Sequence, residues 1–305
     1  MRYTLYAGSY FGIPVRIHFT FPLILIAFGA EAWFSGGWQA ALWALLLILS
    51  VFVCVVLHEF GHSLQVKRYG IAVRDVVLLP IGGMARADRI PEIPRQEIAV
   101  AIAGPLVNFA LAAVIFTVLT VLNRPLSEEP DYLTSLFAIN LVLGTFNLIP
   151  AYPMDGGRIL RALLAMKLPY LRATRYATVV GQLIALAFVV LGFVFSHDLF
   201  MLPIIAVFVF VGAMSEENMI RVRYRLGDRR IGEFVEPPNE PAWVPSPEVG
   251  TRVPAVDADA PALEVYYALK ARKQPAVRVI DSGRIVGIVG LDRLESFEPL
   301  PHAPH

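Results

Sequence analysis

The sequence predicts a membrane-embedded, all-α core of about six transmembrane helices with one re-entrant β segment, followed by a small cytoplasmic α/β domain. Hydrophobic residues make up 56% of the 305 residues and charged residues only 17%, which is far from the balance of soluble proteins. The long apolar runs end near Ile220, and the rest of the chain is rich in proline and charge. We therefore predict a membrane core at residues 1–225, a Pro-rich linker at 226–247 and a cytoplasmic domain at 248–305.

Six apolar runs are each close to the ~20 residues that a helix needs to cross a hydrocarbon core of ~30 Å. The predicted transmembrane helices are His18–Phe34, Ala40–Lys67, Glu97–Leu122, Tyr132–Pro150, Tyr176–Phe195 and Leu199–Ile220. Pro150 and Pro153 are expected to break or kink the chain at the end of the fourth run.

Basic residues predict how the chain lies in the bilayer. Almost all Lys and Arg residues that flank the runs fall on one side, and Arg124 is placed on the other. The positive-inside rule then predicts a multi-pass protein of the cytoplasmic (inner) membrane with both termini in the cytoplasm. The net charge of +1 by itself says little about partners. The lipid bilayer is the expected surrounding, and no direct nucleic-acid partner is expected. Cys54 is the single cysteine, so no intrachain disulfide is expected.

The second run contains the pattern His58-Glu59-Phe60-Gly61-His62. On a helix, this H-E-x-x-H spacing places two imidazoles on one face about 5–6 Å apart, which suits one Zn²⁺, and Glu59 projects beside them. An ionisable side chain inside a span costs at least ~2.5 kcal/mol, so such residues indicate function by default. The alternative is a chance occurrence near an interfacial helix end, where polar residues are tolerated.

Asp155 is the candidate third ligand, because catalytic zinc takes three protein ligands and leaves one position for water. At 1.5 Å per residue, His58 lies roughly 30 Å inward from the outer loop near Gly37, close to the cytoplasmic boundary. The fourth run starts outside at Tyr132 and brings Asp155 to a similar depth. The pair Gly156-Gly157 then permits tight turns. Taken alone, an Asp in such a turn is also explained as a helix cap.

Three separated motifs occur in the order seen in one known family. They are "HEFGH", "GPLVNF" at Gly104–Phe109 and "NLIPAYPMDGGR" at Asn147–Arg158. With these motifs the membrane core resembles the site-2 protease family of intramembrane zinc metalloproteases. The resemblance implies that His58, His62 and Asp155 bind one Zn²⁺ ion and that Glu59 is the general base and acid. A non-haem iron site uses similar ligands, but the H-E-x-x-H spacing favours zinc.

Asparagines supply further candidates on the predicted helices. Asn108 lies ~16 Å deep in the third run, where its amide is expected to orient substrate or stabilise an oxyanion. The resemblance implies a supporting catalytic role for Asn108, while close helix packing at Gly104 and Pro105 is the alternative reason for this motif. Asn140 and Asn147 share a helix face and are candidates for holding the substrate backbone; packing hydrogen bonds explain them equally well.

The stretch Ile71–Ile90 is too short to span the bilayer as a helix and is broken by Pro80 and Gly82-Gly83. Its Val and Leu content predicts a hairpin or a re-entrant segment. In the family this region resembles a membrane-associated sheet near the active site. Its strand edge, with Gly82 and Gly83, is therefore a candidate substrate-binding element. A purely structural interfacial loop is the alternative.

The C-terminal part, from Asp259 to Phe297, predicts a helix, two strands around Asp281–Gly283 and another short helix. This part resembles one cystathionine-β-synthase (CBS) repeat. CBS modules generally work in pairs, and several bind adenine nucleotides, so the resemblance implies a homodimer contact and a site for an adenine nucleotide. Because only one repeat is clear, dimerisation or scaffolding is favoured over nucleotide sensing.

These observations together predict an intramembrane zinc endopeptidase. The predicted reaction is cleavage of a transmembrane segment of a membrane-tethered regulator, such as an anti-sigma or pro-sigma factor, by zinc-activated water with Glu59 as general base. The alternative is a non-catalytic membrane receptor or scaffold with a ligand-sensing CBS-like tail. The intact set of His58, Glu59, His62 and Asp155 argues against that alternative. A prenyl-protein type of membrane protease fits less well, because its third ligand is expected to be a Glu.

Overall fold

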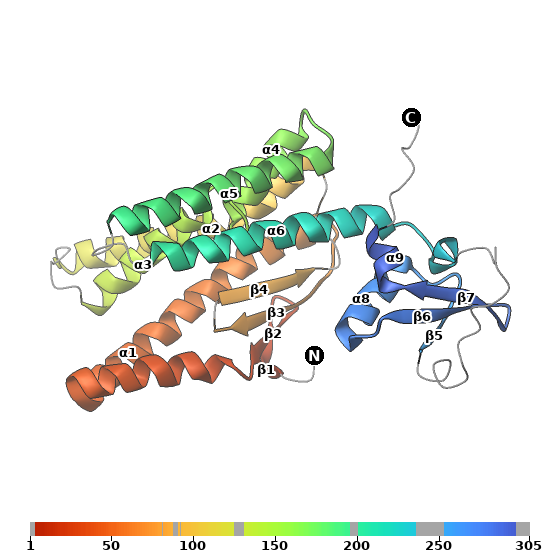
Figure 1. The fold of residues 1–305 in the computed structure, drawn as a ribbon. Coiled ribbons are helices and arrows are strands. Elements are labelled where there is room, and N and C mark those ends of the chain that lie inside the picture. Colours follow the sequence, from red (N-terminus) through yellow and green to blue (C-terminus); the bar gives the residue numbers. More distant parts are fainter. Residues whose placement is uncertain are drawn as a thin grey trace. The chain divides into compact units, whose positions relative to one another are not determined.

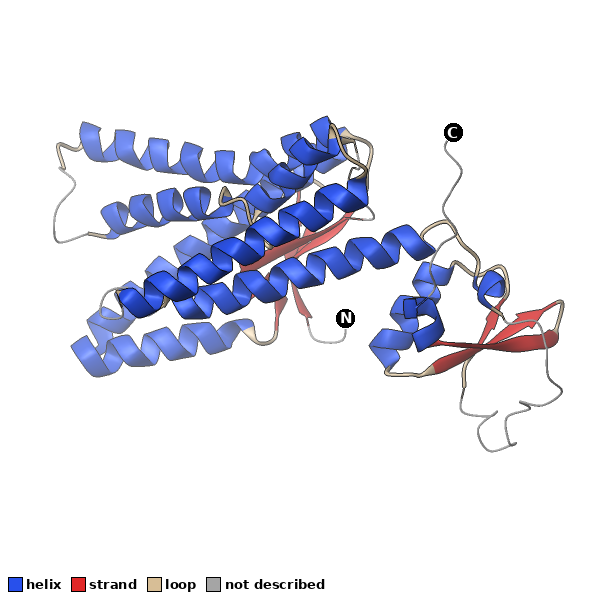
Figure 2. Ribbon diagram, turned by 45° about the horizontal axis from the view of Figure 1, so that its top comes forward, coloured by secondary structure: helices blue, strands red, loops and turns tan. Residues whose placement is uncertain are grey.

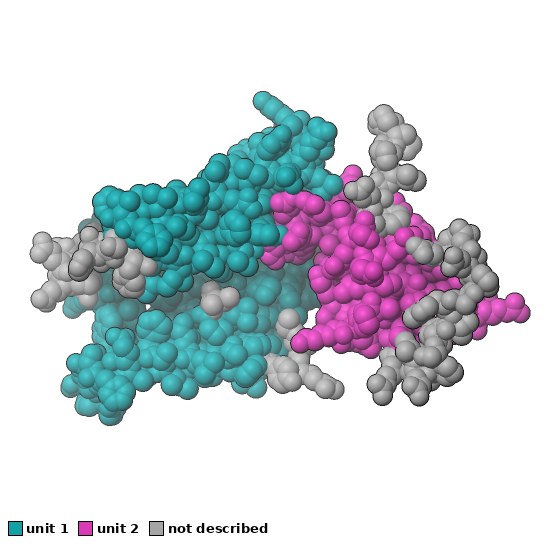
Figure 3. Space-filling view, viewed as in Figure 1, with its two compact units in different colours: residues 1–214 teal, residues 215–305 magenta. Residues whose placement is uncertain are grey.

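The computed structural model describes residues 4–80, 82–87, 91, 93–124, 131–195, 201–235 and 253–296. Residues 236–247, which make up most of the predicted linker, lie outside the described residues. The chain divides into two compact units, Met1–Met214 and Ser215–His305, which Figure 3 shows in separate colours. The domain limits expected at residues 225 and 248 stay predictions.

Among the residues that the structure describes, four helices are long and apolar enough to cross a membrane: α1 (Phe21–Arg68), α2 (Pro94–Val121), α5 (Tyr170–Val194) and α6 (Leu202–Leu226). Helix α1 turns back on itself at Gly37, whose φ of 75° and ψ of −166° are not helical (Figure 1). The two halves of α1 pack through Phe21 and Phe52, whose rings meet edge-on with centroids 4.6 Å apart. These halves occupy the first two predicted spans, and the total of six transmembrane helices stays a prediction.

Helix α3 (Tyr132–Asn147) is shorter, with 16 residues, and begins where the Asp131 side chain accepts a hydrogen bond from the Thr134 N–H. It ends before Pro150, and after a short loop the chain enters α4 (Asp155–Ala165). Gly156 and Gly157 lie directly against the backbone of this loop: a Cβ at Gly157 would be 2.7 Å from the Ala151 carbonyl carbon. The loop and the start of α4 are therefore closely packed.

A four-stranded sheet packs against α1. Strands β1 (Thr4–Tyr10), β2 (Ile13–His18), β3 (Val73–Leu79) and β4 (Gly82–Ala87) lie in that order across the sheet. β2 and β3 are parallel, and the other neighbours are antiparallel. Ile13 and Val76 are fully buried and pack with Phe60, which lies between the two histidines of α1. The hairpin β3–β4 occupies the predicted β segment, whereas β1 and β2 were not predicted. Helices nevertheless make up most of the first unit (Figure 2).

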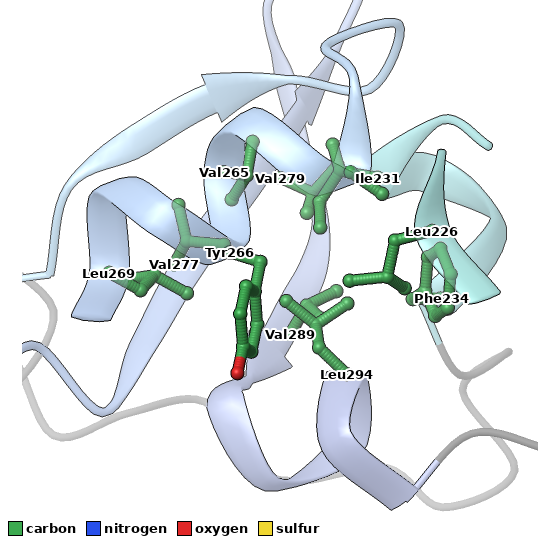
Figure 4. Close-up of a cluster of buried hydrophobic side chains, with 11 residues drawn as sticks. Leu226, Ile231, Phe234, Val265, Tyr266, Leu269, Val277, Val279, Val289 and Leu294 are labelled. Carbon is green, nitrogen blue, oxygen red and sulfur yellow. The ribbon is translucent and has the colours of Figure 1, made fainter. Parts of the chain in front are cut away.

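The second unit has its own sheet and its own core. Strands β5 (Ala255–Asp257), β6 (Ala276–Asp281) and β7 (Arg284–Gly290) lie in that order, accompanied by α8 (Ala262–Arg272), α9 (Leu291–Ser296) and the 3₁₀ turn η1 (Ile231–Phe234). Phe234, Leu269 and Leu294 are almost completely buried in the cluster of Figure 4. The expected succession of helix, two strands and helix is present. The CBS assignment, the nucleotide site and the homodimer contact are not tested by it and stay predictions.

Candidate metal centre

His58 and His62 lie one turn apart on the second half of α1, and their rings face the same side. The ring centroids are 4.7 Å apart and the two Nε2 atoms 3.0 Å apart. Both side chains are buried, with residue exposures of 7% and 8%. The i, i+4 spacing of the motif therefore produces the convergence that it predicts.

Asp155 completes a group of three donor atoms. Its Oδ2 lies 3.3 Å from His58 Nε2 and 3.1 Å from His62 Nε2. Tetrahedral zinc with bonds of about 2.0–2.1 Å would separate its ligand atoms by roughly 3.3 Å, so the observed spacing suits such an ion. His58, His62 and Asp155 are the group of this kind found among the described residues.

The hydrogen bonds behind the histidines set their tautomers. His58 Nδ1 lies 2.5 Å from Asn108 Oδ1, and His62 Nδ1 lies 2.7 Å from the Val100 carbonyl oxygen. Because both oxygens only accept, each Nδ1 carries a hydrogen, and in the neutral imidazole each Nε2 then presents a lone pair. Two lone pairs then face a buried carboxylate oxygen that has no hydrogen-bond partner among the described residues. A cation between the three atoms resolves this repulsion, so the residues fit a metal ion.

Helix α2 supplies the supports for both rings from one face. Val100, Gly104 and Asn108 follow one another at four-residue intervals, which brings them to the same side of the helix. Gly104 lies under the rings, and a Cβ there would be 2.6 Å from His58 Nε2. Asn108 is held in turn, because its Nδ2 donates to Asn140 Oδ1 at 3.0 Å. In the motif "GPLVNF", Gly104 thus leaves room for the two rings, and Asn108, one turn later, supplies the hydrogen-bond acceptor for His58.

Glu59 lies between the metal centre and strand β4. Its Oε2 accepts a hydrogen bond from the Ala85 N–H at 3.0 Å. Gly83 packs directly on the Glu59 side chain, where a Cβ would be 2.7 Å from Glu59 Cγ. The carboxylate is therefore oriented by the backbone of an edge strand rather than by another side chain.

A cavity of about 250 Å³ opens beside these groups. Its lining includes the predicted residues His58, Glu59, Gly82, Gly83, Asn108 and Asn147. Asn140 is fully buried behind Asn108 instead. Sequence reasoning missed Val100, since a main-chain acceptor has no side-chain pattern, and Phe208 of α6, which lines the same cavity.

The fold and the site define a multi-pass membrane protein with a His-His-Asp metal centre and a glutamate beside it. Comparison with known proteins agrees with this class. The model of Peptidase family M50 matches residues 46–130 and 127–188. A zinc metalloprotease of Methanocaldococcus jannaschii is 34% identical over 298 residues, covering 98% of this chain and 81% of the relative.

Two further relatives support the same conclusion. Stage IV sporulation protein FB of Bacillus subtilis is 34% identical over 143 residues, 46% of this chain and 45% of that protein. The solved structure of a site-2 protease from Methanocaldococcus jannaschii matches with a TM-score of 0.52 and 38% identity, covering 70% of this chain and 95% of that one. The chain belongs to Peptidase family M50, the site-2 protease family, and is a zinc metallopeptidase.

Proposed function

We propose that this metallopeptidase cleaves within the membrane, hydrolysing a peptide bond in or beside a transmembrane segment of a membrane-tethered regulator. One observation carries the proposal. The donor atoms of His58, His62 and Asp155 converge on one point, and His58 and Glu59 line a cavity together with Gly82 and Gly83 of the edge strand β4.

In this proposal His58, His62 and Asp155 hold the zinc ion, and Glu59 handles the protons. Zinc, when bound, supplies a Lewis acid that lowers the pKa of a coordinated water towards ~7. Glu59 takes the proton from the attacking water and delivers it to the leaving amine. The Ala85 N–H holds the Glu59 carboxylate in place for both transfers. Asn108 keeps the His58 ring in its tautomer and orientation.

Strand β4 is the proposed binding element for the substrate backbone. Among the described strands it pairs with β3 alone, and its Ala85 N–H points to Glu59. An unwound substrate segment that adds to this edge would expose its peptide bonds next to Glu59, whereas a helix shields them. Asn147 and Gly82 line the same cavity and would contact that segment.

The location and partners follow the sequence predictions. We propose a cytoplasmic (inner) membrane location with both termini in the cytoplasm, on the basis of the basic flanks of the apolar runs. A membrane-tethered transcription regulator, of the anti-sigma or pro-sigma type, is the proposed substrate class by analogy with the family.

The test is cleavage of a model single-span substrate by the full-length protein reconstituted in liposomes. Glu59→Gln is expected to lower the cleavage rate by ~10²–10⁴-fold while zinc remains bound, because only the proton transfers are lost. Glu264→Gln, an exposed glutamate of α8, is the matched control and should cleave like wild type. Mass spectrometry of the products should place the cut in or beside the span.

Two outcomes would contradict the proposal. Zinc-loaded Glu59→Gln that cleaves at the wild-type rate would remove the glutamate from the mechanism. Wild-type protein that binds no zinc and cleaves nothing would favour the receptor or scaffold alternative.

A further inference from the structure

A buried charge pair lies next to the metal centre without belonging to it. Arg161 of α4 and Glu97 of α2 are 0% and 1% exposed. Arg161 Nε donates to Glu97 Oε1 at 2.7 Å, and Nη2 donates to the same oxygen. Burying a charged side chain away from water is costly unless the charge is paired and hydrogen-bonded.

A buried ion pair of this kind is weak evidence of a stabilising role. Each buried ion loses several kcal/mol of hydration, and apolar residues of the same volume are often equally stable or better. A guanidinium–carboxylate pair does fix the relative orientation of the two elements that carry it, because the N–H groups of the planar guanidinium must align with the carboxylate.

On α2, Glu97 lies close in sequence to the residues that contact the two histidines. Glu97 stands one turn before Val100, whose carbonyl oxygen accepts from His62 Nδ1. Gly104, under both rings, and Asn108, bonded to His58, continue the same row at four-residue steps. The carboxylate is therefore part of the helix face that positions both histidine ligands.

On α4, Arg161 lies on the same short helix as Asp155, the proposed carboxylate ligand. Arg161 lies less than two turns after Asp155, in a helix of only 11 residues. Its guanidinium carbon is 5.5 Å from the ring centroid of Tyr152, in the loop before Asp155, and 5.1 Å from that of Tyr170, at the start of α5. Arg161 thus contacts the segments on both sides of α4 as well as α2.

We propose that the Arg161–Glu97 ion pair is a clamp that fixes α4 against α2 and thereby holds Asp155 at ligand distance from His58 and His62. Arg161 and Glu97 are positioning residues that act through the helices carrying the ligands. The inference rests on the proposed function only in treating these three residues as the zinc ligands. Without the clamp, the loop before Asp155 and the packing of α4 alone would set its separations of 3.1 and 3.3 Å from the histidines.

The test measures the zinc dissociation constant of the full-length protein in detergent, by competition with a chromophoric chelator. Arg161→Met removes the charge and the N–H donors at similar length. It should weaken zinc binding about 10- to 100-fold, as losses of a ligand's supports do. Glu97→Gln should weaken binding as well, and the double variant should lose no more than the worse single one, because both changes remove the same clamp. Arg161→Lys keeps the charge but not the planar fork and should lie between Arg161→Met and wild type.

A structural readout and a matched control separate the clamp from general destabilisation. The melting temperature of each metal-free variant is measured in parallel. Arg86→Met breaks another ion pair of the first unit, with Asp75 in the sheet, and should leave zinc affinity unchanged. With Co²⁺ in place of zinc, Arg161→Met should also weaken the visible absorption of a four-coordinate site.

Each result decides one claim. Wild-type zinc affinity in Glu97→Gln and Arg161→Met, alongside weak binding by Asp155→Ala, would overturn the clamp and leave the metal site intact. The same loss of affinity in Arg86→Met would also overturn it, because the effect would then be general. Full zinc affinity in Asp155→Ala would instead overturn the proposed function. If Arg161→Met does not fold, the zinc affinities of Arg161→Lys and Glu97→Gln test the clamp in its place.

Discussion

Substitution of Gly104 by Ala should weaken metal binding strongly while leaving the fold intact. A Cβ at this position would be 2.3 Å from His62 Nε2 and 2.6 Å from His58 Nε2, so the two rings must move by roughly 1.1 and 0.8 Å to reach an ordinary contact. Zinc–ligand distances tolerate only about 0.2 Å of error. We therefore expect zinc affinity to fall by more than ~100-fold, which is more than about 2.8 kcal/mol of binding free energy. This loss is larger than the usual effect of removing a hydrogen bond to a metal ligand.

The assay compares the zinc dissociation constant with the melting temperature of the metal-free protein. Alanine is favoured over glycine within a helix by about 1 kcal/mol, so α2 itself should not be weakened. Gly181→Ala is the matched control in α5, because its Cβ would find its nearest neighbour at 3.4 Å, an ordinary contact. Wild-type zinc affinity in Gly104→Ala would refute the geometry of the site. An equal loss of affinity in Gly181→Ala would show that the effect is not local.

Other substitutions separate the parts of the site. Gly83→Ala should keep its zinc but lower kcat for the model substrate, because the new methyl would meet Glu59 Cγ at 2.7 Å; a simultaneous loss of zinc would contradict this. Asn108→Ala should weaken zinc binding about 10- to 100-fold in the same chelator assay, because His58 loses its acceptor. Phe234→Ala should destabilise the second unit by about 3–5 kcal/mol in denaturant titrations, whereas Tyr267→Ala, 45% exposed, should cost far less.

The three candidate metal-binding residues could be named from the sequence because two of them lie on one helix and the depth of the third can be counted. His58 and His62 are one helical turn apart, so their convergence needs no knowledge of the tertiary fold. Asp155 is distant in sequence, but its depth follows from counting along an apolar run. The position of Glu59 against β4, in contrast, depends on how the sheet packs on α1, which no local pattern describes.

The parts that were missed had weak or non-local signals. β1 is mostly exposed and has no apolar face that a period of two would reveal. β2 did carry such a signal in the alternation of Ile13, Val15 and Ile17, but it lies directly before the first apolar run. The partner of Arg161 could not be inferred, because Glu97 lies 64 residues away along the chain.

X-ray absorption at the zinc edge of the purified, inactive Glu59→Gln protein would test the central claim most directly. The account predicts about one zinc ion per chain, with a first shell of nitrogen and oxygen at about 2.0–2.1 Å that includes two imidazoles. That shell should change in Asp155→Ala, which removes the carboxylate. A sulfur scatterer near 2.3 Å, or a spectrum that Asp155→Ala leaves unaltered, would contradict the assignment of His58, His62 and Asp155 as the zinc ligands.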